Sequence, residues 1–426
     1  MALHVMDEAN HCLGCKNPRC QQGCPIHTDI PRVIRLLKEN KLDEAGRLLF
    51  ENNPLTTVCS LVCNHENQCE GHCVQGIKGA PVHFSVIENY ISSSYASKMT
   101  KGPAVSNGKR VAIIGAGPAG LTIAVILARY GYDVTIFEAH DKIGGVLRYG
   151  IPEFRLPKSV LDDFEYRHLR LKGIKVRPNI DVGKALKIDD LLRDGYKAIF
   201  IGTGVWRPNA LHIKGESLGH VHYAINYLQN PGVYHLGNRV IVIGAGNAAM
   251  DVARTALRNG SRHLQCFSLT QKLTASEYES SYARLEGVDF YYNKKPVEIT
   301  DRGVIFRDVT EDADGTLHDV PGSEQLYCAD SVIVSISQGA CTTITESTQG
   351  LEINERGLFV TDEVGRTSRP GIFASGDAVK GARTVVEAVA YSKKVAEAMH
   401  EYMRDLPPDP PGEYADAPVF QYDDGN

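Results

Sequence analysis

Residues 110–139, "RVAIIGAGPAGLTIAVILARYGYDVTIFEA", decide the fold of this chain. An apolar strand pattern leads into a G-x-G-x-x-G turn, an apolar helix pattern follows, and a second strand pattern ends at an acid. The first glycine of such a turn permits the bend, the second lets a pyrophosphate approach the backbone, and the third lets helix and strand pack closely. The acid can accept a hydrogen bond from a ribose hydroxyl. The stretch predicts a dinucleotide-binding βαβ unit rather than a glycine turn kept only for packing, with these candidate residues: Gly115, Gly117, Pro118, Ala119, Gly120 and Glu138.

The same unit returns at residues 239–269, "RVIVIGAGNAAMDVARTALRNGSRHLQCFSL", 129 residues further along the chain. Two such units predict an α/β fold with two Rossmann-like dinucleotide-binding domains on parallel sheets. In the second unit, the position equivalent to Glu138 falls near Phe267 or Ser268. No acid stands there to hold a 2′-hydroxyl and no arginine pair to hold a 2′-phosphate, and the nearest cation is Lys272.

The second turn therefore indicates a nicotinamide nucleotide site, but its residues do not distinguish NADH from NADPH. The alternative is a degenerate Rossmann unit that no longer binds a nucleotide. The candidate residues of this turn are Gly244, Gly246, Asn247, Ala248 and Ala249.

Two further stretches extend the first unit toward FAD. Gly144 and Gly145 follow Glu138 by six and seven residues. Near the end of the chain, "RPGIFASGDAVKGARTVVEAVAYSKKVAEAM" (369–399) pairs a short strand ending at Gly376 and Asp377 with a helix that starts near Thr384. An acid after a strand can hold the ribityl chain of a flavin. The N-terminus of the helix offers amides and a positive dipole to the pyrimidine edge of the flavin.

Cysteine use points to iron at the front of the chain. Eight of the eleven cysteines fall in the first 73 residues, in two runs spaced C-x2-C-x4-C-x3-C-P and C-x3-C-x5-C-x3-C. Zinc prefers two separated C-x2-C pairs, whereas a terminal C-x3-C-P is similar to the ferredoxin pattern in which the last cysteine ligates a different cluster. We expect iron–sulfur ligation, with structural zinc and ordinary thiols as the alternatives.

Composition excludes other classes of protein. At 426 residues the chain is long enough for two or three domains, and its formal charge of −5 argues against a nucleic-acid surface. The N-terminus lacks the apolar segment of a signal peptide. Residues 111–128 are uncharged, but their glycines favour a strand-to-helix turn over a membrane span. We expect a cytoplasmic protein without a membrane span.

The first hundred residues favour helices. We expect helices in "TDIPRVIRLLKEN" (28–40), in "KLDEAGRLLFENNP" (41–54) and near residues 83–97, and a linker at residues 101–110. The last 21 residues hold five acids and five prolines, which favours a disordered tail over an arm that docks a partner.

The motifs occur in an order that resembles a known family. After the cysteine runs come "GAGPAGL", "GGVLRYGIPEFRLPK" (144–158), "GTGVWRP" (202–208), "GAGNAAMD" and "GIFASGDAV". Together they look like the small subunit of glutamate synthase. They also resemble the N-terminal half of dihydropyrimidine dehydrogenase and the large subunit of NADH-dependent ferredoxin:NADP oxidoreductase. The resemblance covers residues from about 10 to 400, and residues 144–158 are its most specific stretch.

The resemblance implies a helical domain with two [4Fe–4S] clusters, followed by an FAD domain that an NAD(P)H domain interrupts. The implied limits are 1–100 for the cluster domain, 101–211 and 338–405 for the FAD domain, 212–337 for the NAD(P)H domain and 406–426 for the acidic tail. It adds Arg148, Thr203 and Gly204 as candidate cofactor contacts. Relatives often carry an arginine pair after the second Rossmann strand for NADPH, and its absence here slightly favours NADH.

The resemblance also implies a crossed set of cluster ligands. One cluster would be held by Cys12, Cys15, Cys20 and Cys73, and the other by Cys24, Cys63 and Cys69. The fourth ligand of the second cluster varies among relatives. Here Cys59 and Glu88 are both candidates, and the sequence does not choose between them.

These cofactors predict an enzyme that converts two-electron into one-electron transfer. A nicotinamide delivers a hydride, FAD accepts it, and the clusters pass single electrons to a catalytic partner subunit or a ferredoxin. Two alternatives are weaker. A disulfide reductase of the thioredoxin reductase type needs a redox C-x-x-C, which Cys266, Cys328 and Cys341 do not supply. A redox scaffold or sensor subunit would have an inactive nicotinamide site.

Overall fold

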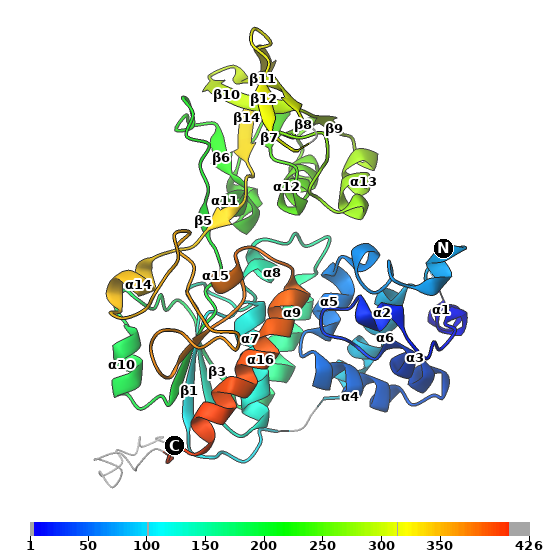
Figure 1. Cartoon of the computed structure of the whole chain (residues 1–426), viewed down its shortest axis with the longest axis vertical. Coiled ribbons are helices and arrows are strands. Elements are labelled where there is room, and N and C mark those ends of the chain that lie inside the picture. Colours follow the sequence, from blue (N-terminus) through cyan, green and yellow to red (C-terminus); the bar gives the residue numbers. More distant parts are fainter. Residues whose placement is uncertain (1–3, 100–101, 313, 409–426) are drawn as a thin grey trace, which may run out of the picture.

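The computed structural model describes residues 4–99, 102–312 and 314–408. In Figure 1 a helical part lies beside a sheet-and-helix part, and a second sheet-and-helix part stands above them. The expected tail falls outside the described residues from residue 409 onward. Within the described part of the chain, no helix is long and apolar enough to cross a membrane.

The helical part holds the three expected helices and three that were not predicted. Asp29 accepts a hydrogen bond from the Arg32 amide at 3.3 Å and Pro31 lies in the first turn, so α3 begins where the cap predicts. The additional helices are Val5–His11, Arg19–Gln22 and the helix that carries Cys59. The helices are α1 (Val5–His11), α2 (Arg19–Gln22), α3 (Ile30–Lys38), α4 (Leu42–Asn52), α5 (Thr56–Val62) and α6 (Phe84–Ser97), with short turns η1 (His65–Asn67) and η2 (Val74–Ile77).

The central part is built on a parallel sheet with the strand order β16-β4-β1-β2-β3. Its strands are β1 (Arg110–Ile114), β2 (Asp133–Phe137), β3 (Lys175–Arg177), β4 (Ala198–Ile201) and β16 (Ile372–Ala374). Its helices and helical turns are α7 (Pro118–Arg129), α8 (Val146–Tyr149), α9 (Lys158–Phe164), η3 (Glu165–Leu169), η4 (Arg170–Lys172), α10 (Ile188–Arg193), α14 (Thr343–Ser347), α15 (Asp377–Lys380) and α16 (Val385–Arg404). Strand β16 comes from near the end of the chain and pairs with β4. The central part is therefore built from sequence that precedes the upper part and from sequence that follows it.

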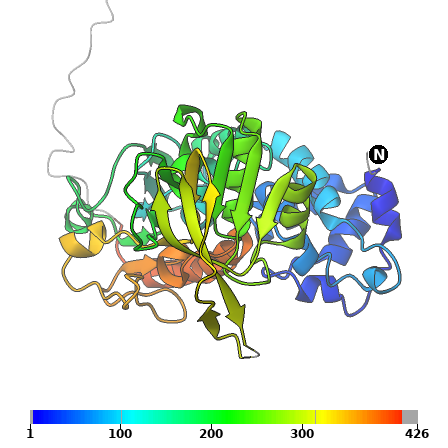
Figure 2. The ribbon, with the colours of Figure 1, turned by 90° about the horizontal axis from the view of Figure 1, so that it is seen from above.

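The upper part has its own five-stranded parallel sheet, with the order β6-β14-β7-β8-β9 (Figure 2). Its elements are β6 (Val221–Tyr223), α11 (Ala224–Gln229), η5 (Pro231–Val233), β7 (Arg239–Ile243), α12 (Asn247–Arg258), β8 (His263–Phe267), α13 (Glu277–Leu285), β9 (Val288–Tyr291) and β14 (Ser331–Val334). A smaller antiparallel sheet joins it, made of β10 (Lys294–Thr300), β11 (Gly303–Glu311), β12 (Leu317–Asp319) and β13 (Gln325–Cys328).

Two crossing segments connect the upper and central parts. They pair antiparallel as β5 (Arg207–Pro208) and β15 (Gln338–Gly339). The two sequence-predicted domain limits, at residues 211 and 338, fall beside this ribbon.

Candidate functional site: a flavin cavity, two cysteine groups and a nucleotide turn

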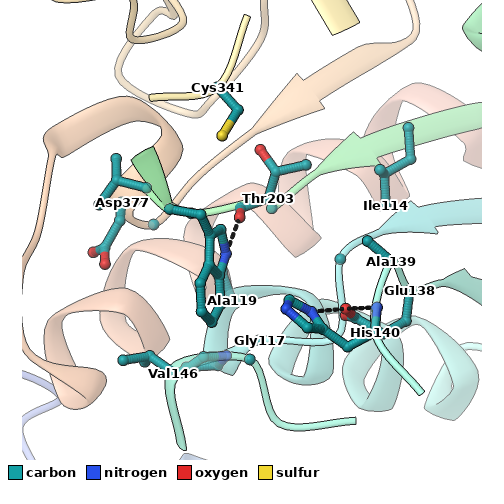
Figure 3. Close-up of a pocket in the computed structure, with 18 of the residues that line it drawn as sticks. Ile114, Gly117, Ala119, Glu138, Ala139, His140, Val146, Thr203, Cys341 and Asp377 are labelled. Carbon is teal, nitrogen blue, oxygen red and sulfur yellow. Dashed lines mark hydrogen bonds and ion pairs between the residues drawn. The ribbon is translucent and has the colours of Figure 1, made fainter. Parts of the chain in front are cut away.

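A cavity of about 460 Å³ lies at the carboxyl ends of the central strands (Figure 3). This is the edge of a parallel α/β sheet at which ligands bind. Eleven of the sequence-predicted residues line the cavity: Gly115, Gly117, Pro118, Ala119, Glu138, Gly145, Thr203, Gly204, Gly376, Asp377 and Thr384. The chain therefore brings together residues that are up to 269 positions apart in sequence.

The glycine turn before α7 leaves space where a pyrophosphate would lie. A Cβ on Gly117 would meet no atom within 4 Å, whereas a Cβ on Gly120 would lie 1.9 Å from the Gly115 carbonyl oxygen. Gly115 has a φ of +96°, a conformation that glycine adopts without strain. The second glycine thus faces the cavity and the third packs helix against strand, as the motif requires.

Glu138 directly follows β2 on one side of the cavity, where its buried carboxylate organises the turn. Its Oε2 accepts from the Ala116 amide at 2.6 Å, and its Oε1 accepts from the His140 amide at 2.8 Å. The His140 ring nitrogen Nδ1 lies 2.8 Å from the same Oε1, as Figure 3 shows. The carboxylate therefore holds two segments of the cavity wall in place.

The sequence analysis missed His140 and Trp206, two aromatic residues that line the cavity. The Trp206 indole donates to the Thr203 carbonyl at 2.9 Å, and its ring centre lies 4.9 Å from that of His140. Tyr149 also stacks on His140, with the two ring centres 4.4 Å apart. The tryptophan stands within the "GTGVWRP" motif, so its position in a loop after a strand was the available signal.

Asp377 and Thr384 lie on the opposite wall, at the N-termini of α15 and α16. Asp377 accepts from the Arg383 amide at 3.1 Å, and burial raises the pKa of its carboxyl to about 6. Thr384 caps the 20-residue helix α16 in a reciprocal arrangement with Glu387. The amides and dipole of this helix therefore face the cavity.

Three of the predicted contacts do not line the cavity. Gly120 packs within the turn, and Gly144, with a φ of +122°, lies beside Leu161 and Arg148. Arg148 donates from Nε to the Ile143 carbonyl at 2.7 Å and from Nη2 to Asp162 at 2.6 Å. Its role as a cofactor contact stays a prediction.

The cavity fits FAD by its own geometry. An open cradle at Gly117, an acid after β2 and a helix N-terminus opposite are the features that the adenosine, pyrophosphate and isoalloxazine portions of FAD require.

The cysteines of the helical part fall into two spatial groups. A small cavity beside α3 is lined by all four cysteines predicted for the first cluster, and by Cys69. Burial raises the pKa of Cys20 to about 11, and Cys73, Cys12 and Cys15 add to the rise because their thiolates repel a further negative charge. The four thiols predicted for the first cluster form a donor set that suits a [4Fe–4S] cluster, and Cys69, predicted for the second cluster, lines the same cavity.

The second group surrounds Cys63. A hydrogen bond with Cys59, burial, and the nearby charges of Cys59, Glu88 and Cys69 raise the pKa of this thiol well above its ordinary value. Cys24 also lies near Cys69, and its Sγ is 3.5 Å from the Thr28 hydroxyl. Glu88 is fully buried and accepts from Thr56 Oγ1 at 2.6 Å.

Both candidate fourth ligands therefore belong to the second group. No three His, Cys, Asp or Glu side chains among the described residues lie close enough to share one metal ion.

The turn of the upper part has the same backbone plan as the first. Gly244 has a φ of +136° and a Cβ there would lie 2.1 Å from the Ser335 carbonyl oxygen. Gly246 caps α12, Asn247 and Ala248 open that helix, and buried Ala249 follows.

The loop after β8 folds back over this turn. The amides of Thr274 and Ala275 donate to the Ala245 carbonyl at 3.1 and 2.9 Å, and the Ser276 amide donates to Asn247 Oδ1 at 2.9 Å. Ser268 is buried directly after β8, and Lys272 is exposed on the loop.

Comparison with known proteins follows this geometry. The family model for pyridine nucleotide-disulphide oxidoreductases matches residues 76–191 and 109–392, and that for the 4Fe-4S cluster domain II of dihydropyrimidine dehydrogenase matches residues 2–100. The chain is 34% identical to the glutamate synthase [NADPH] small chain of Escherichia coli, over 93% of this chain and 91% of that one. The chain belongs to this family of flavin and iron–sulfur oxidoreductases.

Another relative in the family is the NAD-dependent dihydropyrimidine dehydrogenase subunit PreT of Salmonella typhimurium, 32% identical over 95% of both chains. Among solved structures, FprA of Mycobacterium tuberculosis in complex with NADPH matches with a TM-score of 0.59 at 17% identity, over 70% of this chain and 85% of that one. Thioredoxin reductase of Thermoplasma acidophilum matches with a TM-score of 0.53 at 23% identity, over 68% and 97%. These structural matches confirm the α/β fold with two Rossmann-type parts, and the family confirms that the chain is an oxidoreductase.

Proposed function

We propose that the chain is an electron-transfer subunit that links NAD(P)H, FAD and two [4Fe–4S] clusters to a partner protein. When the cofactors are bound, the nicotinamide supplies a hydride, which FAD accepts at N5, and the clusters carry the electrons onward one at a time. The observation that supports this proposal most is the presence of a flavin cavity and two cysteine groups in one chain.

The side chains have roles of binding and orientation rather than of acid–base chemistry. The turn at Gly117 approaches a pyrophosphate, Glu138 faces a ribose, and the N-terminus of α16 faces the pyrimidine edge. Cys12, Cys15, Cys20 and Cys73 hold one cluster. Cys24, Cys63 and Cys69 hold the other, with Cys59 or Glu88 as the fourth ligand.

The names of the relatives support a partner protein. The E. coli relative is the small chain of a glutamate synthase, and another, from Moorella thermoacetica, is the beta subunit of an NADP(+)-dependent formate dehydrogenase. We propose a catalytic partner subunit or a ferredoxin as the site of the final reduction. The proposed place of action is the cytoplasm.

Anaerobic mixing of the purified protein with NADH and, separately, with NADPH tests this function. Bleaching of the flavin absorbance by one of them supports it, and the faster of the two defines the nucleotide preference. Bleaching by neither would favour the scaffold or sensor alternative. Analysis should find about eight iron and eight sulfide per chain, as two [4Fe–4S] clusters require.

A further inference from the structure

The most specific motif of the chain, residues 144–158, has two ends with different surroundings. Its first end, at Gly145, lines the flavin cavity. Its second end, the docking segment of residues 152–155 ("PEFR"), leaves the central part and contacts the upper part. The flavin cavity alone therefore does not account for the motif.

Arg155 makes the main contact of the docking segment. Its Nη1 donates to both carboxylate oxygens of Asp251, at 2.9 and 2.8 Å, and its Nε lies 2.7 Å from Glu279 Oε1. The side chains of these three residues are 15%, 6% and 8% exposed. Asp251 belongs to α12 and Glu279 to α13, so one guanidinium joins two helices of the upper part to the central part.

Phe154 supports this contact through two further arginines. The guanidinium carbons of Arg258 and Arg254 lie 3.9 and 4.7 Å from its ring centre, within the range of a cation–π interaction. Arg254 also pairs with Glu279 at 2.7 Å, and with Glu286 at 3.0 Å. Three arginines and three carboxylates therefore form one charge-balanced network around the phenylalanine.

The docking segment is braced at its base. Lys158 Nζ donates to the Leu147 carbonyl at 2.9 Å and also to the Ile151 carbonyl, and the Lys158 amide donates to Glu153. Burial lowers the pKa of Lys158 to about 8. These bonds tie the docking segment to the α8 turn, which borders the flavin cavity.

The helical part contacts one of these two helices, α13. Glu66, between Cys63 and Cys69, accepts from the Tyr278 amide with both carboxylate oxygens, each at 3.1 Å. Tyr278 lies in the first turn of α13, where a carboxylate is favourable. Figure 1 shows α13 on the side of the upper part that faces the helical part.

We propose that Arg155 is a positioning residue that sets the upper part against the flavin cavity for hydride transfer. Helix α12 starts at the nucleotide turn, so a bond from the central part to Asp251 fixes the nucleotide relative to the flavin. Ile225 and Gln229 of α11 already line the flavin cavity, which shows that the two parts meet there. This inference rests on the proposed function and assigns a role to the docking segment.

The step that Arg155 serves is a transfer of two electrons and one hydrogen. With both groups bound, the C4–H bond of the nicotinamide would break and the hydrogen, with its electron pair, would bond N5 of the flavin, which would leave an oxidised nicotinamide. Such a step depends on the alignment of the two reacting atoms, and a misplacement of about 1 Å can cost roughly 100-fold in rate.

The test is Arg155→Met in the full-length, cofactor-loaded protein. We expect the rate of flavin reduction at saturating nucleotide to fall about 100-fold. The Kd for the nucleotide should change less than about threefold, and photochemical reduction of the flavin should be unchanged, because neither depends on alignment. Amide hydrogen exchange in α12 and α13 should become faster, since their contact with the central part is lost.

Two further variants make the result decisive. Arg155→Lys keeps the charge but loses the two-pronged geometry, so its rate of flavin reduction should lie between those of the wild type and Arg155→Met. If Arg155→Met folds poorly, Arg155→Lys still tests the proposal. Arg193→Met is the matched control, because Arg193 is on the same part but 69% exposed, and pairs only at the surface. It should leave every measurement unchanged.

The outcomes separate the two proposals. A wild type that neither nucleotide reduces would overturn the proposed function and this inference with it. A wild type that is reduced, with Arg155→Met and Arg155→Lys reduced as fast or faster, would overturn this inference alone.

Discussion

Replacing Gly117 by serine separates the flavin site from the stability of the fold. Gly117 caps α7 with a φ of −78°, which any residue adopts, and its missing Cβ faces open space in the cavity. Serine is a better N-cap than glycine by a few tenths of a kcal/mol, so the flavin-free variant should be as stable as the flavin-free wild type. The new side chain would nevertheless occupy the space through which a pyrophosphate approaches the backbone.

The expected magnitude follows from linkage between binding and stability. With free FAD at about 100 times its Kd, binding stabilises the wild type by about 2.7 kcal/mol. We expect Gly117→Ser to weaken FAD binding by at least about 100-fold, which removes most of that stabilisation. Thermal unfolding of both flavin-free proteins, with and without added FAD, measures the difference directly.

A matched control lies in the second turn. Gly246 holds the equivalent position in the upper part, where a Cβ would be 3.5 Å from Thr274 Oγ1. Gly246→Ser should therefore keep the FAD-induced stabilisation and weaken only nucleotide binding. If Gly117→Ser binds FAD within about threefold of the wild type, the assignment of this cavity to FAD is wrong.

Three further predictions concern packing, clusters and pH. Gly120→Ala should lower the free energy of unfolding, measured by chemical denaturation, by about 1–3 kcal/mol or more, and should also reduce the soluble yield, because its Cβ would lie 1.9 Å from the Gly115 carbonyl oxygen. An unchanged free energy of unfolding would contradict the packing role of this glycine. Cys24→Ser should remove the iron and the EPR signal of the second cluster first, whereas loss of only the Cys12 cluster would overturn the crossed ligand assignment. His168→Phe should flatten the acid dependence of stability. Burial lowers the pKa of His168 to about 3, so the native state binds fewer protons than the unfolded state as the pH falls below about 6.5. At about 1.4 kcal/mol per pH unit, the wild type should lose about 2 kcal/mol from this residue between pH 7 and pH 5. Phenylalanine keeps the stacking on Phe50 and Phe164. If urea unfolding shows that the stability of the variant depends on pH as steeply as that of the wild type, His168 is not the cause of this loss of stability.

Local patterns carried the sequence prediction of the fold. Glycine spacing and apolar periodicity act within one turn or one strand, so the βαβ units and the three longest helices of the helical part were predictable. Residues 56–62 were not recognised as a helix, because the stretch is short and its cysteines were read for chemistry alone. In the structure this helix carries Cys59 near Cys63.

Contacts between distant residues were out of reach. Arg155 and Asp251 are 96 positions apart, and Glu66 and Tyr278 are 212 apart, so no local pattern pairs them. His140 lies on the loop after β2 and Trp206 on the loop after β4, and these loops meet at the flavin cavity. Their meeting depends on the order of the strands in the sheet. The contact of each candidate residue with a cofactor stays a prediction, as do the four domain limits.

The order in which electrons reach the cofactors tests the proposed electron path most directly. Anaerobic rapid mixing with NADH or NADPH, followed by absorbance and by EPR of frozen samples, reports flavin and cluster reduction separately. The flavin should be reduced first and the clusters afterwards, and the flavin-free Gly117→Ser protein should show no cluster reduction. Clusters reduced equally fast in that flavin-free protein, or never reduced in the wild type, would contradict this path.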